Sequence, residues 1–216
     1  MSNFNVIDVA QRSLEWYQAR AGRLTGSMAH VITMTGKKKG EESKTRRDYI
    51  LELVSERIAG CAQERLFWTA EMQRGVDIEP IAFCMYEALT GNLVQKSGFL
   101  QHKVLMAGCS LDGHIGDFSG IIELKCPKMA THINYWELPA QLRAEYIAQV
   151  RHNLWISGAA FCDLVSFDNR LPGSKQMVRV RIERRDAQLP EYETAALQFL
   201  SEVADRHQLI MDGAYA

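Results

Sequence analysis

The sequence predicts an α/β or α+β layered domain, with a central mixed sheet of about five strands flanked by helices. Two observations support this fold class. Helical stretches open and close the chain, and the middle holds short apolar segments separated by glycines, which are typical of strands. The length of 216 residues is that of one large domain, so we expect residues 1–216 to form a single domain.

Several stretches are predicted to be helical because their apolar residues recur at helical spacing or because capping residues precede them. They are Leu14–Arg20, Ser27–Met34, about Thr45–Ala59, a stretch around Glu79 that ends at Gly91-Asn92, Met129–Glu137, Pro139–Ser157 and Glu191–Met211. We expect Pro80 to break or bend the helix around Glu79, because proline has no amide N–H to donate inside a helix.

Further stretches are predicted to be strands because each is short and apolar. They are Leu93–Phe99, Val104–Asp112, Gly120–Cys126, Phe161–Phe167 and Met177–Glu183. The first three follow one another directly and are separated by glycines, which is typical of a meander.

Composition excludes several classes of protein. Apolar residues make up 47% and charged residues 24% of the chain, unlike a disordered chain, a collagen or a coiled-coil rod. No window approaches the ~18 uninterrupted apolar residues of a membrane helix, and residues 1–16 lack both the basic start and the apolar stretch of a secretion signal. The five cysteines are an odd number without a CxxC pair, so we expect no disulfide framework and a cytoplasmic location.

The formal net charge of −1 argues against a broad basic surface for a polyanion, but the charge is unevenly distributed. The stretch Gly36–Arg47 is rich in basic residues, and its glycines and mixed charge predict an exposed loop that leads into a helix. The candidate nucleic-acid contacts in it are Lys37, Lys38, Lys39, Arg46 and Arg47.

The segment Ser110–Lys125 holds the strongest candidates for catalytic and metal-binding residues. Asp112 ends one predicted strand at a glycine turn, and Glu123 and Lys125 lie two residues apart on the next. Because a strand alternates its faces, Glu123 and Lys125 point the same way, about 7 Å apart, and hairpin pairing would bring Asp112 to the same end. Two converging carboxylates repel each other unless a cation lies between them, and oxygen ligands select a hard ion such as Mg²⁺ or Mn²⁺.

An acid and a base two residues apart on a strand more often form a weak, solvated surface ion pair. Here Ile121, Ile122 and Leu124 make the strand a buried one, where an acid and a base without a role would be costly. A lysine beside a metal site can orient a water nucleophile or offset charge that builds on a phosphate. The context therefore favours a metal site over a surface ion pair.

The spacing Asp112-x10-Glu123-x-Lys125 is the pattern of the PD-(D/E)XK nucleases, with Leu111 in place of the motif's proline. Five motifs in order extend this likeness: Trp16-x3-Arg20-x-Gly22-x-Leu24-Thr25-Gly26-Ser27, Gly75-x3-Glu79-Pro80-x-Ala82, Ser110-x-Asp112-Gly113, Glu123-Leu124-Lys125-Cys126-Pro127 and Tyr146-x2-Gln149-Val150-x3-Leu154. Together they resemble the phage lambda exonuclease family of viral recombination nucleases. Each motif alone is weak, whereas all of them in the same order are specific.

The resemblance implies a restriction-endonuclease-like core with an all-oxygen metal site. Asp112, Glu123 and the backbone carbonyl of Leu124 would be metal ligands, and Lys125 would activate or position the attacking water. Glu79, on a helix, would help to hold a second metal ion. Gln149 would brace the site from the following helix. His102, His114 and Asp117 have no role in the family pattern, and we assign them none.

The resemblance also implies that Arg20, Ser27 and Ser110 grip the 5′-terminal phosphate of DNA. The free N–H groups and the dipole at the start of the helix opened by Thr25-Gly26-Ser27 would favour an anion, and Arg20 could add a bidentate contact. Without the resemblance, Ser27 would be an ordinary helix cap and Arg20 an ordinary surface charge.

The function implied is that of a Mg²⁺-dependent 5′→3′ exonuclease, with Mn²⁺ as an alternative ion and two ions in each site. It would digest one strand of duplex DNA from a 5′-phosphorylated end, release mononucleotides and leave a 3′ single strand for recombination by annealing. The implied partners are double-stranded DNA ends, two further copies in a ring-shaped homotrimer, and a single-strand annealing protein in the cytoplasm of a bacterial host cell. Two alternatives stay open: a DNA endonuclease of the same fold, of the restriction or junction-resolving type, and a non-catalytic module that binds DNA ends.

Overall fold

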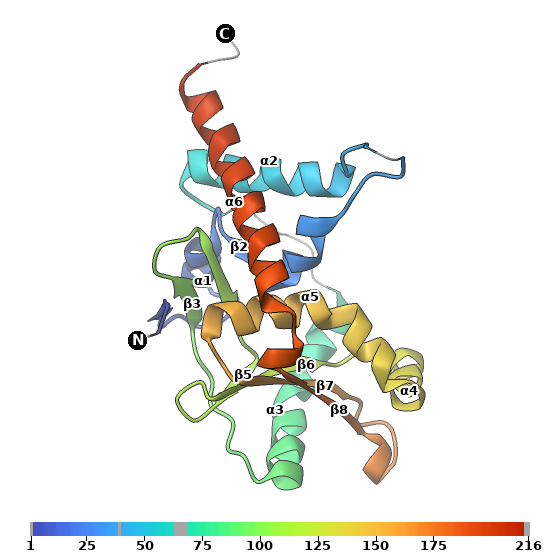
Figure 1. The fold of residues 1–216 in the computed structure, drawn as a ribbon. Coiled ribbons are helices and arrows are strands. Elements are labelled where there is room, and N and C mark those ends of the chain that lie inside the picture. The colour runs from blue at the N-terminus through green and yellow to red at the C-terminus, as the bar shows by residue number, and fades with distance from the viewer. Residues whose placement is uncertain (1, 39, 63–68, 214–216) are drawn as a thin grey trace.

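The computed structural model describes residues 2–38, 40–62 and 69–213 of the chain. Its helices are α1 (Leu14–Arg20), α2 (Lys44–Ala59), α3 (Ala70–Thr90), α4 (Met129–Glu137), α5 (Pro139–Ser157) and α6 (Leu189–Met211), with 3₁₀ helices η1 (Gly26–Thr33), η2 (Gly173–Lys175) and η3 (Arg184–Asp186). Its strands are β1 (Phe4–Ile7), β2 (Leu24–Thr25), β3 (Phe99–His102), β4 (Ala107–Ser110), β5 (Gly113–Ile115), β6 (Gly120–Lys125), β7 (Phe161–Phe167) and β8 (Met177–Glu183). The prediction of a mixed α/β fold is confirmed (Figure 1).

The strands form two four-stranded sheets instead of one sheet of about five strands. One sheet has the order β1-β3-β4-β2 and the other the order β5-β6-β7-β8. Each sheet is mixed, because β2 pairs in parallel with β4 and β6 pairs in parallel with β7, while their other pairs are antiparallel. The chain crosses from one sheet to the other between β4 and β5, and Asp112 lies at this crossing.

Helices cover both faces of the second sheet, with α5 on one face and α3 on the other (Figure 1). Ile121 of β6 belongs to the main core with Val150 and Leu154 of α5. Its neighbour Ile122 instead packs with Phe83 and Tyr86 of α3. Because strand residues alternate, Glu123 and Lys125 share the face of Ile121 and point toward α5.

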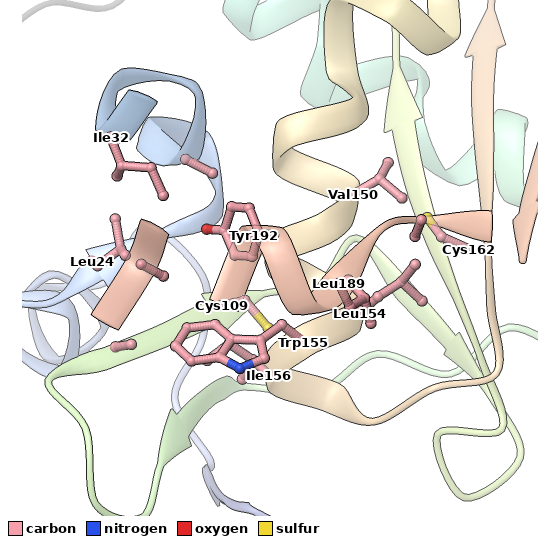
Figure 2. Packing of buried hydrophobic residues seen from close by; sticks show 14 of the residues in the cluster. Leu24, Ile32, Cys109, Val150, Leu154, Trp155, Ile156, Cys162, Leu189 and Tyr192 are labelled. Atoms are coloured by element: carbon pink, nitrogen blue, oxygen red, sulfur yellow. The ribbon is translucent and has the colours of Figure 1, made fainter. Parts of the chain in front are cut away.

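The main core lies around α5, between the two sheets and the helices α2 and α6. Figure 2 shows part of it, where Leu154 and Trp155 of α5 lie among Cys109 of β4, Cys162 of β7 and Tyr192 of α6. The rings of Trp155 and Tyr192 meet edge to face, with centroids 6.0 Å apart. Helix α5 thus contacts both sheets, η1 and α6, which fixes the position of the polar residues on its site-facing side.

Several local predictions are corrected. The helix predicted at Ser27–Met34 is the 3₁₀ helix η1. The strand predicted at Leu93–Phe99 is limited to an isolated bridge between Gln95 and His114, followed by β3. Strands β1, β2 and β5 were not expected, because they have only four, two and three residues and little alternation.

Helix α3 continues through Pro80, so the break expected there as one alternative to a bend is absent. Proline removes the hydrogen bond to the carbonyl four residues earlier, that of Val76. The buried residues Ile78, Ala82 and Tyr86 anchor the helix on both sides of this position, and their packing offsets the loss.

No helix in the described part of the chain is long and apolar enough to cross a membrane.

Candidate active site

Asp112, Glu123, Lys125 and Gln149 lie together where β6 ends beneath α5. Asp112 follows β4, and its Oδ2 accepts a hydrogen bond of 2.7 Å from the backbone N–H of Leu124. This contact ties the crossing between the sheets to the strand that carries Glu123 and Lys125. The structure therefore brings together the acid, acid and lysine of the sequence pattern, as the alternation of β6 predicted.

Glu123 is almost fully buried, with 2% of its surface exposed, and polar partners surround its carboxylate. Oε1 accepts hydrogen bonds from Lys125 Nζ and Gln149 Nε2, both at 2.6 Å. Oε2 accepts a hydrogen bond of 2.8 Å from Asn153 Nδ2. Gln149 Oε1 in turn accepts a bond of 3.1 Å from Lys125, so the amide of Gln149 bridges the acid and the base. Gln149 therefore lies beside Glu123 and Lys125, and its bracing role stays a prediction.

The charges of this cluster shift the pKa values of its members. Burial raises the pKa of Asp112 to about 7, and repulsion from Glu123 adds to the shift while the Lys125 ammonium opposes it. Burial opposes the charged form of Lys125, but the Glu123 and Asp112 carboxylates outweigh it and raise the pKa of Lys125. Lys125 is thus a protonated ammonium at neutral pH, whereas the Asp112 carboxyl is only partly ionised there.

The donor set fits a hard divalent ion. Two carboxylates and the backbone carbonyl of Leu124 offer oxygen ligands alone, and a cation would offset both causes of the raised pKa of Asp112, its burial first and the repulsion from Glu123 second. Among the described residues, no group of three or more His, Cys, Asp or Glu side chains is arranged to hold a metal ion. Asp112, Glu123 and the carbonyl of Leu124 are the groups here that could hold one such ion, and this ligand set stays a prediction.

Glu79 is the member of the predicted site that does not join this group. It lies on α3, where its carboxylate forms an ion pair with Lys96 and lies 4.0 Å from Arg12. Its negative charge still adds to the raised pKa of Asp112, behind the larger effects of burial and Glu123. To hold a second ion, Glu79 would have to exchange Lys96 for that ion.

A second polar cluster surrounds Ser110, which precedes Asp112 by two residues. Ser110 Oγ accepts hydrogen bonds from Trp16 Nε1 at 2.8 Å and from Arg20 Nη1 at 3.1 Å. The guanidinium of Arg20 also donates to Thr25 Oγ1 at 3.4 Å and lies 4.1 Å from the centroid of the Trp16 ring. Two of the three residues predicted to hold a 5′-phosphate, Arg20 and Ser110, are therefore in direct contact.

A cavity of about 240 Å³ opens beside this cluster and is lined by Trp16, Arg20, Arg23, Thr25 and Tyr49, among others. The third predicted phosphate residue, Ser27, is exposed and follows Thr25 by two positions, on the first turn of η1. Guanidinium groups, a hydroxyl and the N-terminal turn of η1 are groups that bind anions.

The candidate nucleic-acid residues of the basic loop fall into two groups. Lys37, Lys38 and Arg47 are exposed, whereas Lys39 lies outside the described residues. Arg46 forms a bidentate ion pair with Glu202 of α6, at 2.7 and 2.9 Å, and its Nε donates to the carbonyl of Ile32. In this structure Arg46 therefore holds α2 against α6 and η1.

Sequence reasoning assigned no role to two residues that contact the site, Trp16 and Asn153. Trp16 was part of a motif, but its N–H donor becomes meaningful only once Ser110 is seen beside it. Asn153 lies four residues after Gln149, so both side chains lie on one face of α5. That spacing, with an amide among apolar neighbours, was the signal that could have identified Asn153.

Comparison with known proteins identifies the family of the chain. The family model of the YqaJ-like viral recombinase domain matches residues 15–160, which include both polar clusters. The chain belongs to this family. No curated protein gives a significant match.

Solved structures of exonucleases share the fold of this YqaJ-family chain. An alkaline exonuclease from Laribacter hongkongensis is 35% identical, with a TM-score of 0.81, and the match covers 94% of this chain and 98% of that one. The same enzyme in complex with dAMP matches equally well, at 34% identity and a TM-score of 0.81. A phage-related exonuclease from Haemophilus somnus 129PT, at 15% identity and a TM-score of 0.66 over 88% of this chain and 96% of that one, shares the fold alone.

Proposed function

We propose that this YqaJ-family protein is a divalent-metal-dependent 5′→3′ exonuclease that acts on double-stranded DNA ends. Membership of the family and the likeness to an alkaline exonuclease place it among the DNA exonucleases of recombination. The observation that carries the finer proposal is the direct succession of two clusters. Arg20 and Ser110 form an anion-binding group, and Asp112, two residues later, joins Glu123 and Lys125 in a metal-binding group.

In this proposal Asp112, Glu123 and the carbonyl of Leu124 hold Mg²⁺ or Mn²⁺. The ion, when bound, acts as a Lewis acid on a phosphate oxygen and lowers the pKa of a water molecule. Two ions in each site are part of the proposal, and the second would require Glu79 to leave Lys96. Because Lys125 keeps its proton, we assign it the orientation of the attacking water and the stabilisation of negative charge on the phosphate. Gln149 holds the Lys125 ammonium and Glu123 in register.

The polarity of digestion follows from the anion-binding group. A terminal 5′-phosphate carries more negative charge than an internal phosphodiester, so Arg20, Ser110 and Ser27 would favour a 5′-phosphorylated end. Holding that end beside Asp112 places the first internucleotide bond near the metal site. The expected products are mononucleotides and a duplex with a 3′ single-stranded overhang, the substrate for recombination by strand annealing.

The partners proposed are duplex DNA ends, a single-strand annealing protein and two further copies of the chain in a ring. A ring of three identical interfaces is an ordinary cyclic assembly. It would also answer the objection from net charge, since a chain at −1 can hold a polyanion by gathering its basic residues around an enclosed path. The exposed Lys37, Lys38 and Arg47 are our candidates for that path.

Substitution of the lysine tests the chemistry of the site. Lys125→Met should lower the rate of digestion of a linear 5′-phosphorylated duplex by about 10²-fold or more, because it removes the group that stabilises developing charge. Lys128→Met is the matched control, because Lys128 is 75% exposed and contacts Glu71 on the surface. Asp112→Ala and Glu123→Ala should abolish digestion. Near-full activity of Lys125→Met in Mg²⁺ would refute the assignment.

A further inference from the structure

We infer that Asn153 is a positioning residue shared by the two halves of the site: it orients Glu123 and also sets the position of the Thr25–Ser27 segment. The inference rests on the proposed function, because it treats Glu123 as a metal ligand and the Thr25–Ser27 segment as part of the anion-binding group. Neither the sequence motifs nor the resemblance gave Asn153 a role.

One end of the Asn153 side chain serves Glu123. Asn153 is 1% exposed, and its Nδ2 donates the 2.8 Å hydrogen bond to Glu123 Oε2. Lys125 and Gln149 both donate to Oε1 of Glu123. Asn153 instead donates to the other carboxylate oxygen, Oε2. The reverse orientation of the amide would bring its oxygen against a carboxylate oxygen, so Glu123 fixes which way the amide points. Loss of this donor would let the carboxylate turn about its last bond.

The other end of the side chain presses against Gly26. Asn153 Oδ1 is buried and has no hydrogen-bond partner among the described residues. A Cβ atom placed on Gly26 would lie 2.4 Å from this oxygen and 3.5 Å from Cγ of Gln149. The backbone of Gly26 does not have a positive φ, so its conformation does not require glycine. Close approach of the Asn153 amide is the reason that a side chain is not tolerated there.

The two contacts join the halves of the site through a single amide group. Gly26 lies between Thr25, whose hydroxyl accepts from Arg20, and Ser27 of η1. The Asn153 amide therefore lies between the Thr25–Ser27 segment and the Glu123 carboxylate. An unpaired buried amide oxygen is unfavourable, and we infer that the fold retains it because the same amide holds Glu123 and supports Gly26.

The test is a titration of the DNA-free protein with Mn²⁺, with free Mn²⁺ measured by electron paramagnetic resonance. Asn153→Leu keeps the branched shape of the side chain but removes the donor, and we expect it to weaken Mn²⁺ binding by about 10- to 100-fold, the usual effect of losing a hydrogen bond to a metal ligand. Ser157→Ala is the matched control. It removes a buried hydrogen bond to the backbone carbonyl of Asn153 but leaves the amide in place, so Mn²⁺ binding should stay unchanged.

Gly26→Ala tests the link from the other side. Its new methyl group would displace the Asn153 amide, so it should weaken Mn²⁺ binding although Gly26 offers no ligand. In the Asn153→Ala background the space is free, so the same Gly26→Ala change should have little further effect. This non-additivity separates transmission through Asn153 from general loss of stability.

Glu123→Ala in the same titration separates failure of the inference from failure of the proposed function. Loss of Mn²⁺ binding in Glu123→Ala together with wild-type binding in Asn153→Leu would overturn the role of Asn153 and leave the metal site standing. Wild-type binding in Glu123→Ala would overturn the metal site itself, and the inference with it. If Asn153→Leu does not fold, Asn153→Ala replaces it, and additive effects of Gly26→Ala and Asn153→Ala would also overturn the inference.

Discussion

Replacement of Asp112 by asparagine should stabilise the metal-free protein while it abolishes digestion. The asparagine side chain keeps an oxygen that accepts the hydrogen bond from Leu124 N–H, but the change removes one of two converging negative charges. Burial, with repulsion from Glu123, raises the pKa of Asp112 to about 7 from its ordinary 3.8. A raised carboxyl pKa means that folding disfavours the charged form, so the group lowers the stability of the fold as pH rises from about 4 to about 7.

The size of the effect follows from this shift. About three pKa units at ~1.4 kcal/mol each give an upper limit of about 4 kcal/mol at about pH 8. Asp112 is partly exposed, so solvent screening reduces this, and we expect a gain of about 2 kcal/mol in the free energy of unfolding for Asp112→Asn. For a chain of this length that gain corresponds to a rise in Tm of roughly 4–8 °C. The gain should shrink as the pH falls toward the ordinary pKa of 3.8 and vanish only below about pH 3, where the wild-type carboxyl is protonated in both states.

The assay is thermal unfolding in EDTA across this pH range, with Asp117→Asn as the control. Asp117 is an exposed acid on the loop between β5 and β6, and its replacement should leave Tm unchanged. Addition of Mg²⁺ should raise the Tm of the wild type but not that of Asp112→Asn, since a ligand stabilises only the state that binds it. A Tm of Asp112→Asn at or below that of the wild type in EDTA at about pH 8 would refute the reasoning.

Three further predictions concern other parts of the molecule. Arg20→Ala should slow digestion of 5′-phosphorylated ends by about 10- to 100-fold but leave 5′-hydroxyl ends nearly unaffected, whereas equal losses on both would make Arg20 structural. Burial lowers the pKa of His152 to about 4, so on acidification the unfolded state takes up a proton before the folded state does. Between about pH 7.5 and 5 the wild type should therefore lose about 2 kcal/mol of unfolding free energy that His152→Gln does not lose. Parallel pH profiles of the two proteins in denaturant melts would contradict this. Light scattering should give a mass near three times 24.5 kDa, and Lys37→Gln/Lys38→Gln should weaken DNA binding and reduce its salt dependence; a monomer would contradict the ring.

The sequence predicted which site residues lie together better than it predicted the arrangement of the sheets. Alternation along β6 placed Glu123 and Lys125 on one face, and the resemblance placed Gln149 beside them, as the hydrogen bonds bear out. These residues lie on elements with clear periodicity. The division into two sheets was missed because the predicted strand Val104–Asp112 gives way to a separate three-residue strand, β5, which pairs with β6 while β4 pairs with β3. Strand β2 was missed too, since it has two residues and pairs with β4 more than 80 positions later. Strands that short carry no pattern of their own and form only because tertiary contacts hold them.

Contacts made through side chains from distant segments were also beyond the sequence. The pairing of Glu79 with Lys96 depends on how α3 lies beside the segment that precedes β3. Arg46 looked like a DNA contact in a basic run, and its partner Glu202 lies 156 residues away on α6. Asn153 was recognisable in principle, because it follows Gln149 by one helical turn, but only the structure identifies Glu123 and Gly26 as the groups on either side of it.

The most direct test of the proposed activity follows labels at the two ends of one strand. A linear duplex phosphorylated at one 5′ end should release a 5′ label as a mononucleotide at once, while a 3′ label on the same strand is released last. A closed circular duplex should remain intact in the same reaction. Release of the 3′ label first, or linearisation of the circle, would contradict a 5′→3′ exonuclease and favour the opposite polarity or an endonuclease.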